Sequence, residues 1–122
     1  MDKVFLPGPN RIFVFGSNEA GIHGAGAALT AYHDYGAEWH HAEGLQGSSY
    51  AIPTKDKTVA RTLNRFEIEP YVNRFIEFAR AHPELYFFVT RIGCGLAGYT
   101  DAEMAPLFTG APENCELPEG WR

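Results

Sequence analysis

The chain has 122 residues, 45% of them hydrophobic and 14% aromatic, so we expect one compact domain over residues 1–122 with a sizeable core. The net charge of −5 argues against a general nucleic-acid-binding surface, but backbone N–H groups could still hold one anionic ligand. No apolar run is long enough for a membrane span or a signal peptide, which predicts a cytoplasmic protein without membrane contact. Cys94 and Cys115 are too few for a disulfide scaffold, and we expect free thiols.

Strands are predicted in three segments, residues 11–15, 49–53 and 85–90. The last, LYFFVT, is a continuous aromatic and β-branched run, which is typical of a strand buried on both faces. We also expect a short edge strand at residues 4–6, before the turn Pro7-Gly8-Pro9.

Three segments have the pattern of helices. The first covers about residues 24–35 and should end at Gly36, because glycine favours the position after a helix. The second repeats apolar residues at spacings of three and four, which gives one buried face: Ile68, Val72, Phe75, Ile76 and Ala79. Its start has two candidates, since Asn64 with Glu67 could form a capping box, whereas Pro70 favours a later first turn.

The third helix should begin at residues 100–103, TDAE, which form a capping box with an extra acid in the first turn. Pro106 should kink or shorten this helix. After Phe108, Pro112 and Pro118 predict an irregular tail.

The alternation of strands and helices predicts an α/β domain with a largely parallel sheet. Glycine-rich turns at residues 16–26 and 93–98 each follow a strand and precede a helix, so both should lie at the edge where such sheets bind ligands. The first turn matches neither the dinucleotide fingerprint nor a P-loop. We expect its glycines to let backbone donors approach an anion, the alternative being a connection that needs several positive φ angles.

VFGSNEAGIHGAGAA, YAIPTKD and VTRIGCGLAGY, in this order and spacing, resemble the macro domain, an ADP-ribose-binding α/β module, over about residues 11–108. RIGCGL is the most specific motif, and it is similar to the branch with terminal ADP-ribose glycohydrolases and an ADP-ribose 1″-phosphate phosphatase. The resemblance implies a three-layer fold with a mixed, largely parallel central sheet flanked by helices. It also implies ADP-ribose or a related nucleotide as ligand, free or attached to a protein or nucleic acid, with no cofactor and no metal.

The resemblance implies a role for several positions. Asn18 matches an asparagine that hydrogen-bonds the distal ribose, and Lys55 matches the lysine with which the glycohydrolases attack the anomeric carbon. Residues 21–26 match the first phosphate loop, and residues 93–99 match the second, which closes over the diphosphate and distal ribose. The ligand-binding residues expected on this basis are Gly16, Ser17, Asn18, Gly21, Ile22, His23, Gly24, Ala25, Gly26, Ile92, Gly93, Cys94, Gly95, Leu96, Ala97, Gly98 and Tyr99.

The sequence departs from the glycohydrolase pattern at one place. Ala97 occupies the position where the second loop would carry the acid that assists the lysine, and the nearest carboxylates are Asp101 and Asp56. Phosphatase-like relatives carry L-A-G in this loop, as this chain does, so phosphate removal stays open. The candidate catalytic residues are Lys55, Asn18 and Asp101.

Three other functions remain open on the sequence. The missing loop acid favours a binding module that recognises ADP-ribose without turnover. Cys94 could act as a nucleophile with His23 as its base, although no third residue is evident to orient the pair. A protein with purely structural glycines would bind no nucleotide at all.

Overall fold

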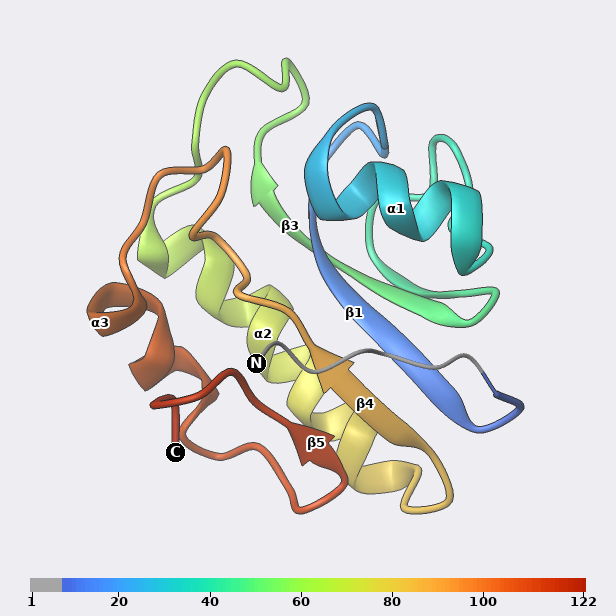
Figure 1. Cartoon of the computed structure of the whole chain (residues 1–122). Helices are drawn as coiled ribbons and strands as arrows, with labels where there is room; N and C mark the ends of the chain where they lie inside the picture. The colour runs from blue at the N-terminus through green and yellow to red at the C-terminus, as the bar shows by residue number, and fades with distance from the viewer. Residues whose placement is uncertain (1–7) are drawn as a thin grey trace.

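The computed structural model describes residues 8–122, in which helices alternate with strands (Figure 1). The strands are β1 (Arg11–Asn18), β2 (Gly44–Gln46), β3 (Ser49–Lys55), β4 (Tyr86–Val89) and β5 (Cys115–Glu116). The helices are α1 (Gly26–Asp34), α2 (Arg65–Ala81) and α3 (Asp101–Met104), and the 3-10 helix η1 (Ala105–Phe108) directly follows α3. The edge strand predicted at residues 4–6 lies outside the described residues. No helix within residues 8–122 is long and apolar enough to cross a bilayer.

The strands form one mixed, largely parallel sheet in the order β2-β3-β1-β4-β5. β1 lies at its centre and pairs in parallel with both β3 and β4, and β4 pairs in parallel with β5. β2 forms an antiparallel hairpin with β3. The α/β class and the largely parallel sheet that the sequence predicted are therefore confirmed.

Helices cover both faces of this sheet, and α1 and α2 lie on opposite sides of it (Figure 1). The alternating side chains of β1 show the division, because successive residues of a strand point to opposite faces. Ile12 and Val14 belong to the larger core, which includes the buried residues of α2, whereas Phe13 and Phe15 pack with Ala28 and Ala31 of α1.

Backbone pairing extends β1 and β3 beyond their predicted limits, whereas β4 is one residue shorter at each end than the predicted range 85–90. β1 continues three residues past Phe15, because Gly16 and Ser17 still pair with Ile52 and Pro53 of β3. β2 and β5 were not predicted, and β5 lies in the tail that was expected to be irregular. β2 has three residues and β5 has two, which is too few for a recognisable apolar pattern. Each forms by pairing with a longer neighbouring strand.

The first and third helices follow their end signals closely. α1 begins two residues later than predicted, at Gly26, and Gly36 adopts a left-handed φ of 78° just beyond its end. α3 has the predicted capping box between Thr100 and Glu103. As expected from Pro106, α3 is short and passes into the 3-10 turn η1.

The capping box, and not the proline, determines where α2 begins. The Asn64 side chain accepts a hydrogen bond from the Glu67 N–H at 2.9 Å, and the Glu67 carboxylate accepts one from the Asn64 N–H at 3.0 Å. Pro70 lies inside the helix and cannot donate to the carbonyl of Phe66. Since Phe66 is 87% exposed, water can reach this turn and the missing bond is tolerated.

Removal of the cap should therefore destabilise the domain. We expect Asn64→Ala to lower the free energy of unfolding by about 1 kcal/mol, measured by urea denaturation. Asn73→Ala is the matched control, because Asn73 is an exposed residue inside the same helix and alanine has the higher helix propensity. Equal midpoints for the two variants would show that the capping box does not stabilise α2.

Candidate functional site

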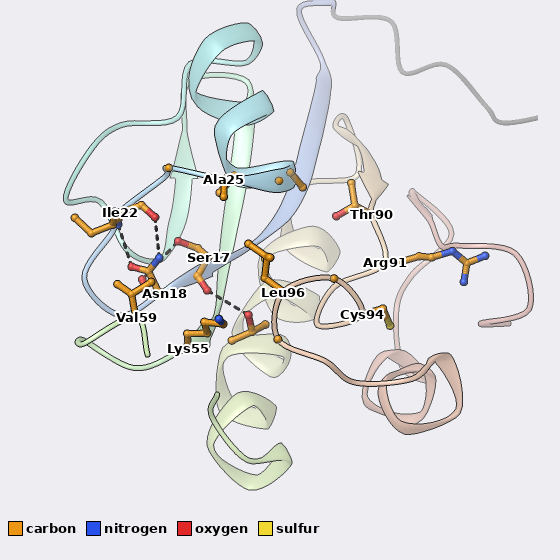
Figure 2. Close-up of a pocket in the computed structure, with 18 residues that line it drawn as sticks. Ser17, Asn18, Ile22, Ala25, Lys55, Val59, Thr90, Arg91, Cys94 and Leu96 are labelled. Atoms are coloured by element: carbon orange, nitrogen blue, oxygen red, sulfur yellow. Dashed lines mark hydrogen bonds between the residues drawn. The ribbon is translucent and has the colours of Figure 1, made fainter. Parts of the chain in front are cut away.

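A cleft of about 720 Å³ opens where the carboxyl ends of β1, β3 and β4 meet the N-terminus of α1 (Figure 2). Because the three strands are parallel, the segments that follow them gather at this one edge of the sheet. Both glycine-rich loops contribute to the lining, which confirms that they lie on the same edge.

Most of the predicted site residues line this cleft: Gly16, Ser17, Asn18, Ile22, Gly24, Ala25, Gly26, Lys55, Cys94, Gly95, Leu96 and Ala97. The others lie outside the lining: Gly21, His23, Ile92, Gly93, Gly98, Tyr99 and the catalytic candidate Asp101. The structure adds residues that the sequence analysis missed: Ala27, Ala28, Thr54, Val59, Thr90 and Arg91. Thr90 and Arg91 directly follow β4, and their place at a strand end was a usable signal.

Asn18 shapes the turn after β1. Its Oδ1 accepts hydrogen bonds from the N–H groups of Ala20 at 3.2 Å and Ile22 at 2.9 Å, and its Nδ2 donates to the Ile22 carbonyl at 2.7 Å. An amide side chain offers two donors and two acceptor sites. One N–H of Asn18 therefore remains for a ligand, while the rest of the amide holds the loop.

A β-bulge places Lys55 beside Asn18. Ser17 pairs with Pro53, the next pair is Asn18 with Lys55, and Thr54 is the extra residue between them. Pro53 has no N–H to donate, and the Thr54 hydroxyl donates to the Ser17 carbonyl at 3.2 Å. Bulges redirect side chains, and this one brings Lys55 to the end of β3 inside the cleft lining.

The lining carries positive charge although the chain is acidic. Lys55 and Arg91 are its cations, and no Asp or Glu within residues 8–122 lines the cleft. Lys55 forms no ion pair with any of the described residues. Nor is any group of three His, Cys, Asp or Glu placed to hold a metal ion in this part of the chain. The charges suit an anionic ligand.

The N-terminus of α1 also faces the cleft. Its N-cap residue is Ala25, which has no side-chain oxygen and forms no cap hydrogen bond. The first N–H bonded within the helix belongs to Leu29, which donates to the Ala25 carbonyl at 3.3 Å. The preceding N–H groups, of residues 26–28, belong to residues that line the cleft, and the helix dipole favours negative charge there.

Two glycines of the loops are required by the fold itself. Gly21 has a φ of 71°, and a Cβ on it would lie 2.6 Å from the backbone of His40. Gly93 has a φ of 80°, and a Cβ there would lie 2.9 Å from Cε of Met104. Left-handed backbone and close contact explain these glycines without any ligand.

Three glycines of the lining have no such explanation. Gly16, Gly24 and Gly95 lie outside the left-handed region, and a Cβ on any of them would meet nothing closer than 3.7 Å. The fold would therefore accept the methyl group of an alanine at each position. All three line the cleft, so a side chain would occupy space beside a bound ligand.

The second glycine-rich loop is anchored at both ends. The Tyr99 N–H donates to the Gly93 carbonyl at 2.8 Å, and the Tyr99 hydroxyl donates to the Leu63 carbonyl at 2.5 Å. Tyr99 thus packs beneath the loop and does not line the cleft. Leu96, at the middle of the loop, is 71% exposed and lies near the centre of the view in Figure 2.

Val59 brings backbone strain to the cleft lining. It is a β-branched residue with a left-handed φ of 64°, which is a rare conformation for such a side chain. Its N–H donates to the Asp56 carbonyl at 3.0 Å, and the Asp56 carboxylate accepts hydrogen bonds from Thr58 and Arg61. Strained residues held by their surroundings cluster at functional sites.

The structure does not join Cys94 to His23. The Cys94 thiol lies 3.7 Å from the Ile92 carbonyl and 3.8 Å from Asp101 Oδ1, and His23 is buried elsewhere. Burial, and then the nearby charge of Asp101, raise the pKa of the Cys94 thiol. Because the thiolate is the nucleophile, this arrangement disfavours a thiol-dependent hydrolase.

Asp101 is occupied by other partners at the start of α3. Its Oδ1 accepts a hydrogen bond from Trp121 Nε1 at 2.8 Å and pairs with the guanidinium of Arg91. The Trp121 bond, followed by Arg91, lowers the pKa of this carboxyl below its ordinary value. Asp101 is thus an ionised partner of Arg91 outside the cleft.

Buried Gln46 supports the first glycine-rich loop from behind. Its Oε1 accepts from the Glu38 N–H at 2.8 Å and lies 3.2 Å from His23 Nε2, and its Nε2 donates to the His41 carbonyl at 2.9 Å. Since the Gln46 oxygen faces the imidazole, His23 Nε2 carries the proton, and Nδ1 is a buried lone pair without a hydrogen-bond partner among residues 8–122. His23 is therefore a neutral structural residue.

Comparison of the chain with protein-family models, curated proteins and solved structures gave no match. The geometry of the cleft and the motifs in the loops around it are therefore the observations that bear on function.

Acid should destabilise the loop through His23. Burial lowers the pKa of His23 below its ordinary value of about 6.5, so the unfolded chain binds this proton more tightly than the folded one. The contribution of neutral His23 to the free energy of unfolding is therefore present above about pH 6.5 and is lost as the pH falls below it. We expect the Tm of the wild type to drop more than that of His23→Gln between about pH 7.5 and 5.5. An equal drop in Tm for the two proteins would contradict the destabilisation through His23.

Proposed function

We propose that the chain is a macro domain-like protein that binds ADP-ribose or a close derivative in this cleft. The observation that carries the proposal is the set Gly16, Gly24 and Gly95, glycines that line the cleft and that neither φ nor a neighbouring atom requires. Glycine at such positions lets a ligand lie directly against the backbone.

The charges around the cleft support a diphosphate as the anionic part of the ligand. The uncapped N-terminus of α1 offers backbone donors and a positive dipole end, and Lys55 adds a full charge, while the second cation of the lining, Arg91, is paired with Asp101. With no carboxylate of residues 8–122 in the lining, nothing described there repels a phosphate group.

The three stretches that resemble macro domains all contribute to the cleft, which supports the nucleotide assignment. Residues 16–28, 54–55 and 90–97 lie far apart in sequence and supply the lining together with Val59. Asn18 retains one N–H, which suits the hydroxyl of a distal ribose.

Binding without turnover is the form of this function that the geometry favours. A lysine nucleophile must lose its proton before it can attack a carbon, and a neighbouring base, such as a carboxylate, usually accepts that proton. Asp101 is paired with Arg91, and Asp56 accepts hydrogen bonds from Thr58 and Arg61. Neither carboxylate lines the cleft with Lys55.

Calorimetric titration with ADP-ribose, ADP and AMP tests the proposal, and Gly95→Ala tests the observation behind it. We expect ADP-ribose to bind more tightly than ADP, and Gly95→Ala to weaken ADP-ribose by tenfold or more, about 1.4 kcal/mol. The free energy of unfolding of Gly95→Ala should equal that of the wild type or exceed it by about 0.4–1 kcal/mol.

Gly110→Ala is the matched control. Gly110 also has open space around it and no left-handed φ, and it does not line the cleft, so its variant should bind like the wild type. Absence of ADP-ribose binding at millimolar concentration, or full binding by Gly95→Ala, would refute the proposal.

Lys55 should contribute its charge to ligand binding. We expect Lys55→Gln to weaken the binding of ADP-ribose by tenfold or more, since a hydrogen bond to a charged group contributes about 1.5–3 kcal/mol. Lys57→Gln, an exposed lysine two residues away and outside the lining, should change affinity little. The alternative outcome is that the wild type turns over an ADP-ribosylated peptide or ADP-ribose 1″-phosphate. If Lys55→Gln then lost this turnover but kept its affinity, the result would indicate a chemical role for this lysine.

A further inference from the structure

Arg91 has one partner outside the cleft although it belongs to the lining. It directly follows Thr90 at the carboxyl end of β4, and its guanidinium pairs with Asp101 Oδ1 at the start of α3. Figure 2 shows its side chain extending away from Leu96 and Lys55. The cation that shortly precedes the second glycine-rich loop in sequence is therefore turned aside in this structure.

The pair with Asp101 is weak enough to be exchanged. The side chains of Arg91 and Asp101 are 49% and 54% exposed, and exposed ion pairs contribute little to stability because water screens them. Asp101 does not depend on Arg91 alone, since the same oxygen accepts the Trp121 Nε1 hydrogen bond at 2.8 Å. Departure of the guanidinium would leave an exposed carboxylate that water and Trp121 still satisfy.

A phosphate group in the cleft would be an alternative partner for this guanidinium. Arginine stays charged at all relevant pH values and can donate two parallel hydrogen bonds to a phosphate. The uncapped N-terminus of α1 and Lys55 would already hold the anion in place, so the guanidinium would meet an oriented acceptor.

We infer that Arg91 binds a phosphate of the ligand and that Asp101 holds its guanidinium aside until the ligand arrives, an inference that rests on the proposed function. Arg91 is then a binding residue, and Asp101 is a competitor for it and has no role as an acid.

The placement of the two cations also indicates the class of ligand. Lys55 ends β3 and Arg91 follows β4, and these strands flank β1 on either side. Two strand spacings separate β3 from β4 by roughly 10 Å. A diphosphate ester that extends across the carboxyl end of β1 can place one phosphate beside each cation. Arg91 should therefore discriminate a nucleoside diphosphate ester from a nucleoside monophosphate.

The sign of the Asp101→Asn effect tests the inference. Asparagine keeps an oxygen for Trp121 but releases Arg91, so we expect ADP-ribose to bind two- to about fivefold more tightly. Arg91→Gln should weaken the binding of ADP-ribose by tenfold or more, and it should reduce the ratio between the affinities for ADP-ribose and AMP. Arg65→Gln removes the same charge from an exposed helix residue outside the lining, and it serves as the matched control. Weaker or unchanged binding by Asp101→Asn, or equal affinities for Arg91→Gln and Arg65→Gln, would overturn the inference.

Tryptophan fluorescence gives a second readout. The chain has two tryptophans, so Trp39→Phe leaves Trp121 as the only tryptophan. Trp121 donates its Nε1 hydrogen bond to Asp101 and so reports on this carboxylate. Ligand binding should shift the Trp121 emission as Arg91 leaves Asp101, and Arg91→Gln in the same background should abolish the shift. A shift that persists without Arg91 would contradict the exchange.

Titration with inorganic pyrophosphate separates this inference from the proposed function. If the wild type binds pyrophosphate but not ADP-ribose, the nucleotide proposal fails, and the effects of Asp101→Asn and Arg91→Gln on pyrophosphate still decide the exchange. If the wild type binds neither anion, both are overturned.

Discussion

The parallel pairing of β1 with both of its neighbours is the constraint on which the site depends. Only because β3 and β4 run in the same direction as β1 do Asn18, Lys55 and Thr90 come to one edge of the sheet. Parallel strands also require long crossover connections. Here the connections begin at the same edge, so each contributes a loop to the cleft, and one contributes the N-terminus of α1.

Local signals predicted the elements that carry their own pattern. The aromatic run of β4 and the capping boxes at Asn64 and Thr100 lie where the sequence indicated. Two local signals competed at α2, and the capping box prevailed because Pro70 leaves only one carbonyl without a donor, in a turn that water reaches. The extension of β1 and the strands β2 and β5 could not be predicted, since they follow from pairing partners that no local pattern specifies.

The site could be predicted as a region but not as an arrangement of side chains. The density of glycine marked both loops, yet the sequence does not show that Gly21 is needed for a close backbone contact and Gly95 is not. That difference depends on φ and on neighbouring atoms, which only the folded chain provides. Likewise, Asp101 is four residues from Ala97 in sequence but contacts Arg91 and Trp121, because α3 begins at Asp101.

The shortness of β2 and β5 has a consequence for the behaviour of the molecule in solution. A sheet edge exposes unpaired N–H and C=O groups, and a long, flat edge invites pairing with another molecule. Among residues 8–122, the two outermost strands have three and two residues, while the three longer strands lie between them. The Arg122 side chain also donates to the Cys115 carbonyl at 2.8 Å, so part of the β5 backbone is occupied. The sheet thus ends in strands that offer little template for growth, which protects its apolar, aromatic-rich centre from edge-to-edge aggregation.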